Sequence, residues 1–245
     1  MTILIGTSGF HYPHWENDVF YPTGLPKSKQ LEFYAEYFDT VELNVTFYRL
    51  PSKEAFKGWK DRTPADFHFA LKGSRFITHI KRLKDAKEPL ATFLEHATPL
   101  RSKISCILWQ LGPNHHLNLE RLESFVKLLA RRKGLRHAFE FRHESWFVPE
   151  VFDLIRNAGM TVCRADWPEF TTEIPEGFSF EYVRRHGPRS GTLYAGCYTE
   201  NHLKDDAKII KRCVKKGKDV LIYFNNDAQG WAVKNALRLK ELVKP

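Results

Sequence analysis

Short apolar stretches alternate with longer amphipathic stretches along the whole chain. The apolar stretches have a period of two and end in turn-forming or polar residues, which is typical of β-strands. The amphipathic stretches have the spacing of a helix that buries one face. The pattern predicts strands over 3–7, 40–45, 67–73, 104–111, 138–146 (a strand with its loop), 160–166, 180–186 and 219–224. It predicts helices over 27–38, 52–62, 80–96, 119–132, 149–158, 202–216 and 229–243, and loops over 46–51 and 167–175.

Eight strands that mostly alternate with helices predict an α/β protein with a parallel sheet. We expect a (β/α)₈ TIM barrel, a single domain over residues 1–245, because no linker or shift in composition divides the chain. A doubly wound open sheet is the alternative. The barrel is favoured because polar residues recur at the carboxyl end of nearly every predicted strand, and a barrel gathers its site on that face.

The segment AFEFRHESW, residues 138–146, shows this feature most clearly. Phe139 and Phe141 fall on one face of the predicted strand, and Glu140 and Arg142 on the other. Buried charges are costly unless they are paired, so we expect these two either to neutralise each other or to hold a ligand.

The predicted strand ends together supply candidates for catalysis and for anion binding. Cations and a histidine there can clamp a phosphate or carboxylate, with a glutamate as general base. The predicted catalytic residues are Glu140, Glu42 and His186. The predicted substrate-binding residues are Lys72, Arg142, Arg184, Asn44, Gln110, His79 and Asn225, together with His11 and Tyr12 from the loop after the first strand.

Two other interpretations of these charges stay open. Hard oxygen ligands and a histidine suit Mg²⁺ or Mn²⁺, so the alternative metal set is Glu42, Glu140, Asp166 and His186, although the sequence requires no cofactor. The charges can also form a purely structural ion-pair network. A structural network explains the whole set less well, because a barrel interior that needs only to be filled is most readily filled by valine, isoleucine and leucine.

Composition adds a second candidate class of partner. The net charge of +9 is uneven, because residues 1–120 carry 15 basic and 13 acidic side chains and residues 121–245 carry 23 and 16. A basic surface attracts polyanions, so a nucleic-acid-binding protein is an alternative, with the rings of Phe10, Tyr12, Tyr48, Trp146 and Trp167 available for stacking. A surface made basic for solubility explains the charge equally well.

The sequence also indicates the cellular compartment of the protein. Four scattered cysteines lack the spacing of a zinc site or a disulfide framework, and no apolar run is long enough to cross a bilayer. We therefore expect a cytoplasmic protein with reduced thiols and no membrane partner. The chain contains no P-loop, GxGxxG, GxSxG or HExxH motif, so no named reaction follows from a motif.

Seven segments resemble one known family. IGTSGF, TVELNVTFYRLPS, FHFALKGSRFITH, LWQLGP, FEFRHESW, YVRRHG and YFNND are similar to the YecE-like family, a domain-of-unknown-function family with a TIM-barrel fold. The resemblance extends from Ile5 to about Leu242, with departures at Phe10, Gly112 and Arg185. It implies a TIM barrel and marks as motif positions Glu42, Asn44, Lys72, His79, Gln110, Glu140, Arg142, Arg184, His186 and Asn225. It implies no settled activity.

The leading hypothesis is therefore an enzyme that acts on a phosphorylated or otherwise anionic small molecule at the strand ends. Arg142, Arg184, His186 and Lys72 bind the anion in this hypothesis, and Glu140 or Glu42 accepts a proton. A nucleic-acid-binding protein, and a metal-dependent nuclease or isomerase-like enzyme, are the alternatives.

Overall fold

The strands of the protein form two parallel sheets in the computed structural model, which describes residues 1–167, 173–188 and 194–244. One sheet has the order β1-β9-β8-β7 and the other the order β2-β3-β4-β5-β6. Every strand pairing among these residues is parallel, which requires a crossover connection between successive strands. The strands are β1 (Ile3–Thr7), β2 (Thr40–Leu43), β3 (His68–Lys72), β4 (Ile104–Gln110), β5 (His137–Glu140), β6 (Thr161–Val162), β7 (Arg164–Ala165), β8 (Phe180–Arg185) and β9 (Asp219–Phe224).

The two sheets adjoin where β1 approaches β2 and where β6 leads into β7. Ser8, directly after β1, forms an isolated parallel bridge with Glu42 of β2. Cys163 alone separates β6 from β7: its N–H donates to the carbonyl of Phe139, whereas Arg164 and Ala165 pair with β8. The predicted strand over 160–166 is therefore two short strands in different sheets. The α/β fold with parallel strands is confirmed, but strand pairing in the described residues gives sheets of four and five strands and no single closed barrel.

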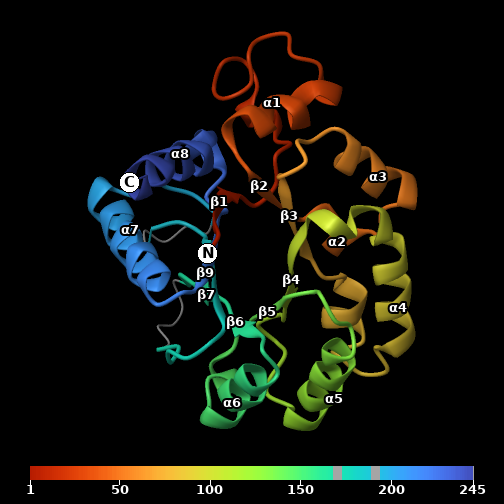
Figure 1. Ribbon diagram of the computed structural model, residues 1–245. Coiled ribbons are helices and arrows are strands. Elements are labelled where there is room, and N and C mark those ends of the chain that lie inside the picture. The colour runs from red at the N-terminus through yellow and green to blue at the C-terminus, as the bar shows by residue number, and fades with distance from the viewer. Residues whose placement is uncertain (168–172, 189–193, 245) are drawn as a thin grey trace.

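The helices lie around the outside of the strands (Figure 1). They are α1 (Gln30–Tyr37), α2 (Val45–Tyr48), α3 (Lys53–Asp61), α4 (Lys87–His96), α5 (Leu119–Ala130), α6 (Pro149–Asn157), α7 (Glu200–Lys215) and α8 (Trp231–Val243). Six of the predicted helices correspond to α1, α3 and α5 to α8, with ends shifted by up to three residues. A side-chain cap explains where α3 begins: Ser52 is its N-cap, and the Ser52 hydroxyl accepts a hydrogen bond from the Ala55 N–H.

Two predictions for the segments after β2 and β3 are wrong. The predicted loop over 46–51 contains the helical turn α2, and the predicted helix over 80–96 begins only at Lys87, after a π-helical turn at Phe76–Ile80. Between that turn and α4, Arg82, Leu83 and Asp85 have left-handed φ angles of 48°, 65° and 48°. A right-handed helix cannot continue through such residues. The predicted loop over 167–175 includes 168–172, which lie outside the described residues.

The strands separate two hydrophobic clusters. The larger one packs the helices against the outward faces of the sheets, through residues such as Phe69, Trp109 and Phe139. The smaller one lies between the two sheets and takes residues from both. Its members are Leu4, Ala70, Cys106, Leu108, Ala138, Cys163, Phe180, Tyr182, Leu221 and Tyr223. Because side chains alternate along a strand, the residues two positions further on in these strands point into the same space.

Close approach of β1 to β2 depends on Gly6. A Cβ atom at this position would lie 2.4 Å from the carbonyl oxygen of Thr40. We expect Gly6→Ala to lower the free energy of unfolding by about 1–3 kcal/mol, the usual cost of forcing atoms into a packed interior. Gly58→Ala in α3 is the matched control because a Cβ there meets nothing within 4 Å, and it should raise stability by up to about 1 kcal/mol through helix propensity. Urea unfolding measures both, and equal effects would contradict this account.

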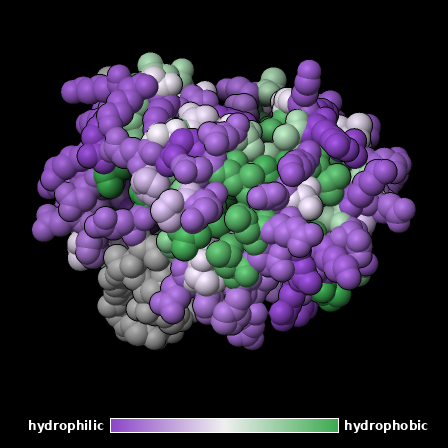
Figure 2. Space-filling model, turned by 90° about the horizontal axis from the view of Figure 1, so that it is seen from below, coloured by the Kyte–Doolittle hydropathy of each residue, from purple (hydrophilic) through white to green (hydrophobic). Residues whose placement is uncertain are grey.

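Most of the surface on the side of α5 and α6 is hydrophilic, with a group of hydrophobic residues near its middle (Figure 2). No helix in the part of the chain that the structure describes combines the length and apolar character needed to cross a bilayer.

Candidate functional site

Polar side chains occupy the carboxyl ends of the strands, directly above the cluster between the sheets. Each lies two residues after an inward-facing residue of its strand, as the period of two requires. The set comprises Glu42, Lys72, Gln110, Glu140, Arg184 and Asn225. Every one of these residues is buried, so their charges act on one another in a medium that screens them weakly.

Arg184 is the centre of this group and joins the two sheets. From β8 its Nη2 lies 2.7 Å from Oε1 of Glu42 on β2, and its Nη1 lies 2.7 Å from Oε2 of Glu140 on β5. None of the three side chains is more than 1 % exposed. Burial alone would raise the pKa of the Glu140 carboxyl, but the charges of Arg184 and Arg142 hold it well below its usual range.

Hydrogen bonds occupy the remaining acceptor positions of Glu42. The Ser8 hydroxyl donates to Oε1 at 2.8 Å, and the Tyr182 hydroxyl donates to Oε2 at 2.6 Å. The sequence prediction missed both donors, although Tyr182 shares the inward face of β8 with Arg184 and could have been found from the period of two. Together with Arg184, these donors give both side-chain oxygens of Glu42 a partner at the junction of the two sheets.

Arg142 and His186 complete the surroundings of Glu140. Arg142 Nε lies 3.0 Å from Glu140 Oε1, and its guanidinium lies 4.0 Å from the centre of the Trp167 ring. His186 stacks on that same ring, its Nε2 lies 3.5 Å from Glu140 Oε1, and Nδ2 of Asn225 lies 3.0 Å from its Nδ1. Burial lowers the pKa of His186 to about 4, so its imidazole is neutral at pH 7.

Lys72 differs from Arg142 and Arg184 because it forms no ion pair with an acid among the described residues. Its side chain is buried, and in the described part of the chain its Nζ has no ion pair or hydrogen bond; it lies 4.1 Å from the centre of the Phe47 ring. Burial, followed by the positive charge of Arg184, lowers the pKa of Lys72 to about 7. The amine of Lys72 therefore titrates near neutral pH.

A cavity of about 790 Å³ opens above Lys72 at the strand ends. Six of the predicted site residues line it: His11, Tyr12, Asn44, Lys72, Arg184 and Asn225. Its other lining residues are Gly9, Phe10, Lys27, Leu43, Val45, Tyr48, Trp59, Arg62, Tyr194 and Asp227. The cavity thus receives residues from the ends of β1, β2, β3, β8 and β9, which belong to both sheets.

Asn44 presents an unused acceptor to this region. Its Nδ2 donates to the Ser8 carbonyl at 3.2 Å, while its Oδ1 is buried without a hydrogen-bond partner. The two predicted residues from the loop after β1 are already engaged: His11 shares a hydrogen bond with Gln30, and the Tyr12 hydroxyl donates to the Ser8 carbonyl. A buried polar atom without a partner marks a position where a donor from a ligand would be favourable.

The other predicted residues lie beside the cavity and do not line it. Glu42, Glu140, Arg142 and His186 form its polar surroundings through Arg184. Gln110 is buried and donates weakly to the Leu111 carbonyl at 3.4 Å. His79 shares a hydrogen bond with Thr78 and contacts the Phe47 ring, and burial together with the charge of Lys72 lowers its pKa to about 4.

The predicted metal set is not assembled. Asp166 accepts hydrogen bonds from the Tyr198 hydroxyl and from the backbone N–H of His186. Its carboxylate lies 3.7 Å from Arg185 and so belongs with that arginine, apart from Glu42 and Glu140. Arg184, already a cation, fills the space between Glu42 and Glu140. Among the described residues no three side chains of histidine, cysteine, aspartate or glutamate are placed to hold a metal ion.

Arg185 points away from Arg184, because neighbouring residues of a strand face opposite sides. Its guanidinium pairs with Asp206 of α7 and with Asp166, and its side chain is 21 % exposed. It therefore connects β8 to α7 on the outer side of the sheet.

The whole chain matches one family model. The model described as "Protein of unknown function DUF72" covers residues 4–245. The chain belongs to the DUF72 family. UPF0759 protein YunF of Bacillus subtilis is 26 % identical to this DUF72 chain over 98 % of it and 94 % of YunF. UPF0759 protein YecE of Escherichia coli K12 is 29 % identical over 60 % of the chain and 53 % of YecE. The resemblance to the YecE-like family is confirmed.

Solved DUF72 structures have the same fold. A DUF72 family protein from Thermotoga maritima superimposes with a TM-score of 0.87 and 29 % identity over the full length of both chains. Another from Enterococcus faecalis gives 0.82 at 22 % identity over 99 % of this chain and 95 % of that one. A 3-keto-L-gulonate-6-phosphate decarboxylase from Vibrio cholerae gives 0.53 at 11 % identity, a likeness of fold alone. The family descriptions name no activity or substrate.

Proposed function

We propose that this DUF72 protein is an enzyme that acts on a small phosphorylated or otherwise anionic substrate in the cavity at the strand ends. The observation that carries the proposal is Lys72, a buried amine with no acidic partner among the described residues, which lines an open cavity beside Arg184. A buried ammonium without a counter-ion is unfavourable, and an anion entering the cavity would supply one.

In this proposal the two sheets are arcs of one (β/α)₈ barrel. Support comes from the bridge between Ser8 and Glu42, the step through Cys163 from one sheet to the other, and the shared cluster between the sheets. The carboxyl ends of barrel strands are where enzymes with this fold bind substrates. We also place the protein in the cytoplasm, in keeping with four cysteines that are all free.

The role of each predicted site residue follows from whether its polar atoms face the cavity or are already bonded within the protein. Lys72 binds the anion and, with a pKa near 7, is the group that can exchange a proton with a substrate at neutral pH. Asn44 and Asn225 would orient the substrate from the cavity wall. Glu42 and Glu140, predicted as catalytic, act here as positioning residues because their oxygens are engaged with Arg184 and Arg142. His186, also predicted as catalytic, is held through its Nδ1 by Asn225.

Sulfate binding tests the proposal directly. We expect the wild-type protein to bind sulfate in isothermal titration calorimetry, and Lys72→Met to weaken that binding on the order of tenfold or more, the usual worth of a charge-assisted hydrogen bond. Lys211→Met, which removes an exposed lysine from α7, is the matched control and should bind as the wild type does. Absence of sulfate binding to the wild-type protein would reject the proposal.

The pH dependence of the same titration identifies the amine. Sulfate keeps its charge between about pH 6 and pH 9, so a change in affinity reports on the protein. Because the anion pairs with the protonated amine and the pKa of Lys72 is about 7, affinity should be constant below that pH and fall above it by up to about tenfold per unit. The Lys72→Met protein should lack this fall. A wild-type affinity that stays constant to pH 9 would contradict the assignment to Lys72.

A further inference from the structure

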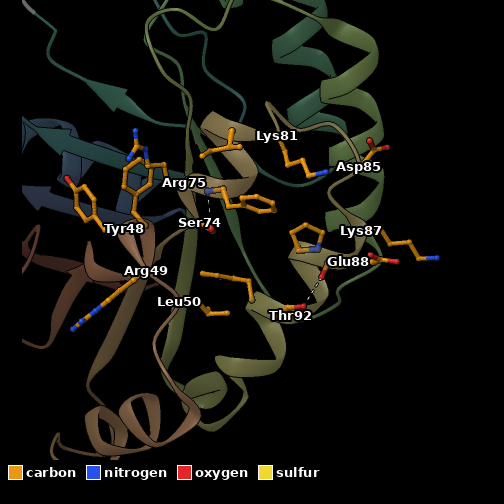
Figure 3. A pocket seen from close by; sticks show the side chains of 15 residues that line it. Tyr48, Arg49, Leu50, Ser74, Arg75, Lys81, Asp85, Lys87, Glu88 and Thr92 are labelled. Atoms are coloured by element: carbon orange, nitrogen blue, oxygen red, sulfur yellow. Dashed lines mark hydrogen bonds between the residues drawn. The ribbon is translucent and has the colours of Figure 1, made fainter.

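A second cavity, of about 920 Å³, lies beside the first, on the outer side of the segments that follow β2 and β3. It is a groove between α2, the turn Phe76–Ile80 and α4 (Figure 3). The described part of the chain has eight exposed large hydrophobic side chains, and four of them line this groove: Tyr48, Leu50, Phe76 and Ile80. Tyr48 is 72 % exposed and Phe76 47 %, so both rings are available to a ligand.

Cations accompany these rings. Four basic and two acidic residues line the groove: Arg49, Arg75, Lys81, Lys87, Asp85 and Glu88. None of the four cations forms an ion pair with a residue that the structure describes. Figure 3 shows Tyr48 and Arg75 on one side of the groove and Lys81, Asp85 and Lys87 on the opposite side, while Arg49 points away from it. The Nζ of Lys81 lies 5.9 Å from the centre of the Phe76 ring.

The groove adjoins the cavity at the strand ends, and Tyr48 lines both. A ligand with its anionic group near Lys72 would pass Tyr48 and extend into the groove. The residues that line the two cavities include the cations Lys72, Arg75 and Lys81 and the rings of Tyr48 and Phe76.

We infer that the groove binds the bases and phosphates of a single-stranded nucleic acid, one phosphate of which occupies the cavity at the strand ends. The inference rests on the anion-binding cavity proposed above and extends its ligand from a small anion to one phosphate of a polymer. Exposed rings beside unpaired cations are the means by which proteins bind single strands, since every base has a face that stacks and every linkage carries a charge. In a duplex the bases are stacked on one another, so they are not free to stack on the rings of Tyr48 and Phe76.

The location differs from the one that composition alone suggested. The excess of positive charge lies in residues 121–245, whereas the groove is built from residues 47–93. Of the five rings predicted to stack on bases, Trp146 and Trp167 are buried and only Tyr48 is largely exposed. Phe76 replaces them as the second stacking surface.

Fluorescence anisotropy with a labelled oligothymidylate of about ten nucleotides tests the inference. We expect Tyr48→Ala and Phe76→Ala each to weaken binding by roughly 5- to 150-fold, the range measured for loss of one stacked base. Ile209→Ala, which removes another exposed apolar side chain, from α7, is the matched control and should leave affinity unchanged.

Salt dependence tests the cations. The pair Arg75→Gln and Lys81→Gln should reduce the slope of log affinity against log salt concentration by about 1.4, which corresponds to two phosphate contacts on a single strand. The pair Lys211→Gln and Lys215→Gln on α7, with the same loss of charge, should leave the slope as it is.

The outcomes separate this inference from the proposed function. Sulfate binding to wild type with no binding of the oligonucleotide would overturn the inference and leave the proposed function standing. Ring variants that bind the oligonucleotide as the wild type does would also overturn it, because charge alone would then explain the binding. Weakened oligonucleotide binding by Phe76→Ala with unchanged sulfate affinity would support it.

Discussion

Lys72→Met is expected to make the protein more stable at about pH 6 while it weakens anion binding. Burial lowers the pKa of Lys72 from 10.5 to about 7, and each pKa unit corresponds to about 1.36 kcal/mol. Charging the amine in the folded protein therefore costs on the order of 5 kcal/mol. Methionine fills a similar volume and needs no counter-ion, so urea unfolding should show a gain of a few kcal/mol at this pH.

The gain should depend on pH in a defined direction. Between about pH 7 and pH 10.5 the unfolded state holds the proton on Lys72 and the folded state does not, so the stability of the wild type rises with pH across this interval. The Met variant lacks this rise, and the difference between the two should shrink toward pH 10. A loss of stability at pH 6 would contradict the account.

Lys103 supplies the matched control for that experiment. It is also buried, but its Nζ donates to the carbonyl oxygens of Lys60, Thr63 and Pro64 and to the Thr63 hydroxyl, at 2.7–3.0 Å. Lys103→Met would leave these acceptors without a donor and should cost stability. Two buried lysines should thus give effects of opposite sign, and the presence of partners explains the difference.

Arg184→Met is expected to lower the free energy of unfolding by about 3–5 kcal/mol, the usual cost of removing one member of a buried charged network. The substitution leaves the carboxylates of Glu42 and Glu140 buried without their shared cation. Adding Glu42→Gln and Glu140→Gln to the variant should recover part of the loss, because the stranded charges are then removed. Urea unfolding at pH 7 measures all of these proteins.

An exposed arginine with similar contacts is the control. Arg238 binds both carboxylate oxygens of Glu200 at 3.0 and 2.7 Å, but its side chain is 45 % exposed. Arg238→Met should change stability by less than about 1 kcal/mol, as exposed ion pairs do. If the two arginines gave equal losses, burial would not be the cause of the effect at Arg184.

The period of two made most of the strand-end residues predictable. It placed Glu42, Lys72, Glu140, Arg184 and Asn225 on inward faces, and the structure brings all five together. The period of two could not assign the ion-pair partners of these side chains, because the partners depend on the order of the strands in space. Asp166 lies outside this pattern: it directly follows Ala165, which packs on the inner cluster, so its carboxylate falls on the opposite face and accepts from Tyr198.

The segment after β3 was mispredicted for a different reason. Residues 80–96 have the apolar spacing of one helix, but Arg82, Leu83 and Asp85 adopt left-handed angles that no local signal from glycine or proline announces. Tertiary packing sets them: Leu83 is buried in the cluster beneath the helices. The groove beside the strand ends exists because the chain turns there, so the sequence alone could not reveal it.

Arg184 comes from one sheet and both of its acids come from the other. A fragment ending after β6 would hold Glu42 without its ion-pair partner and Glu140 with Arg142 alone, and the complementary fragment would hold Arg184 without either acid. Neither half of the chain is therefore electrostatically self-sufficient.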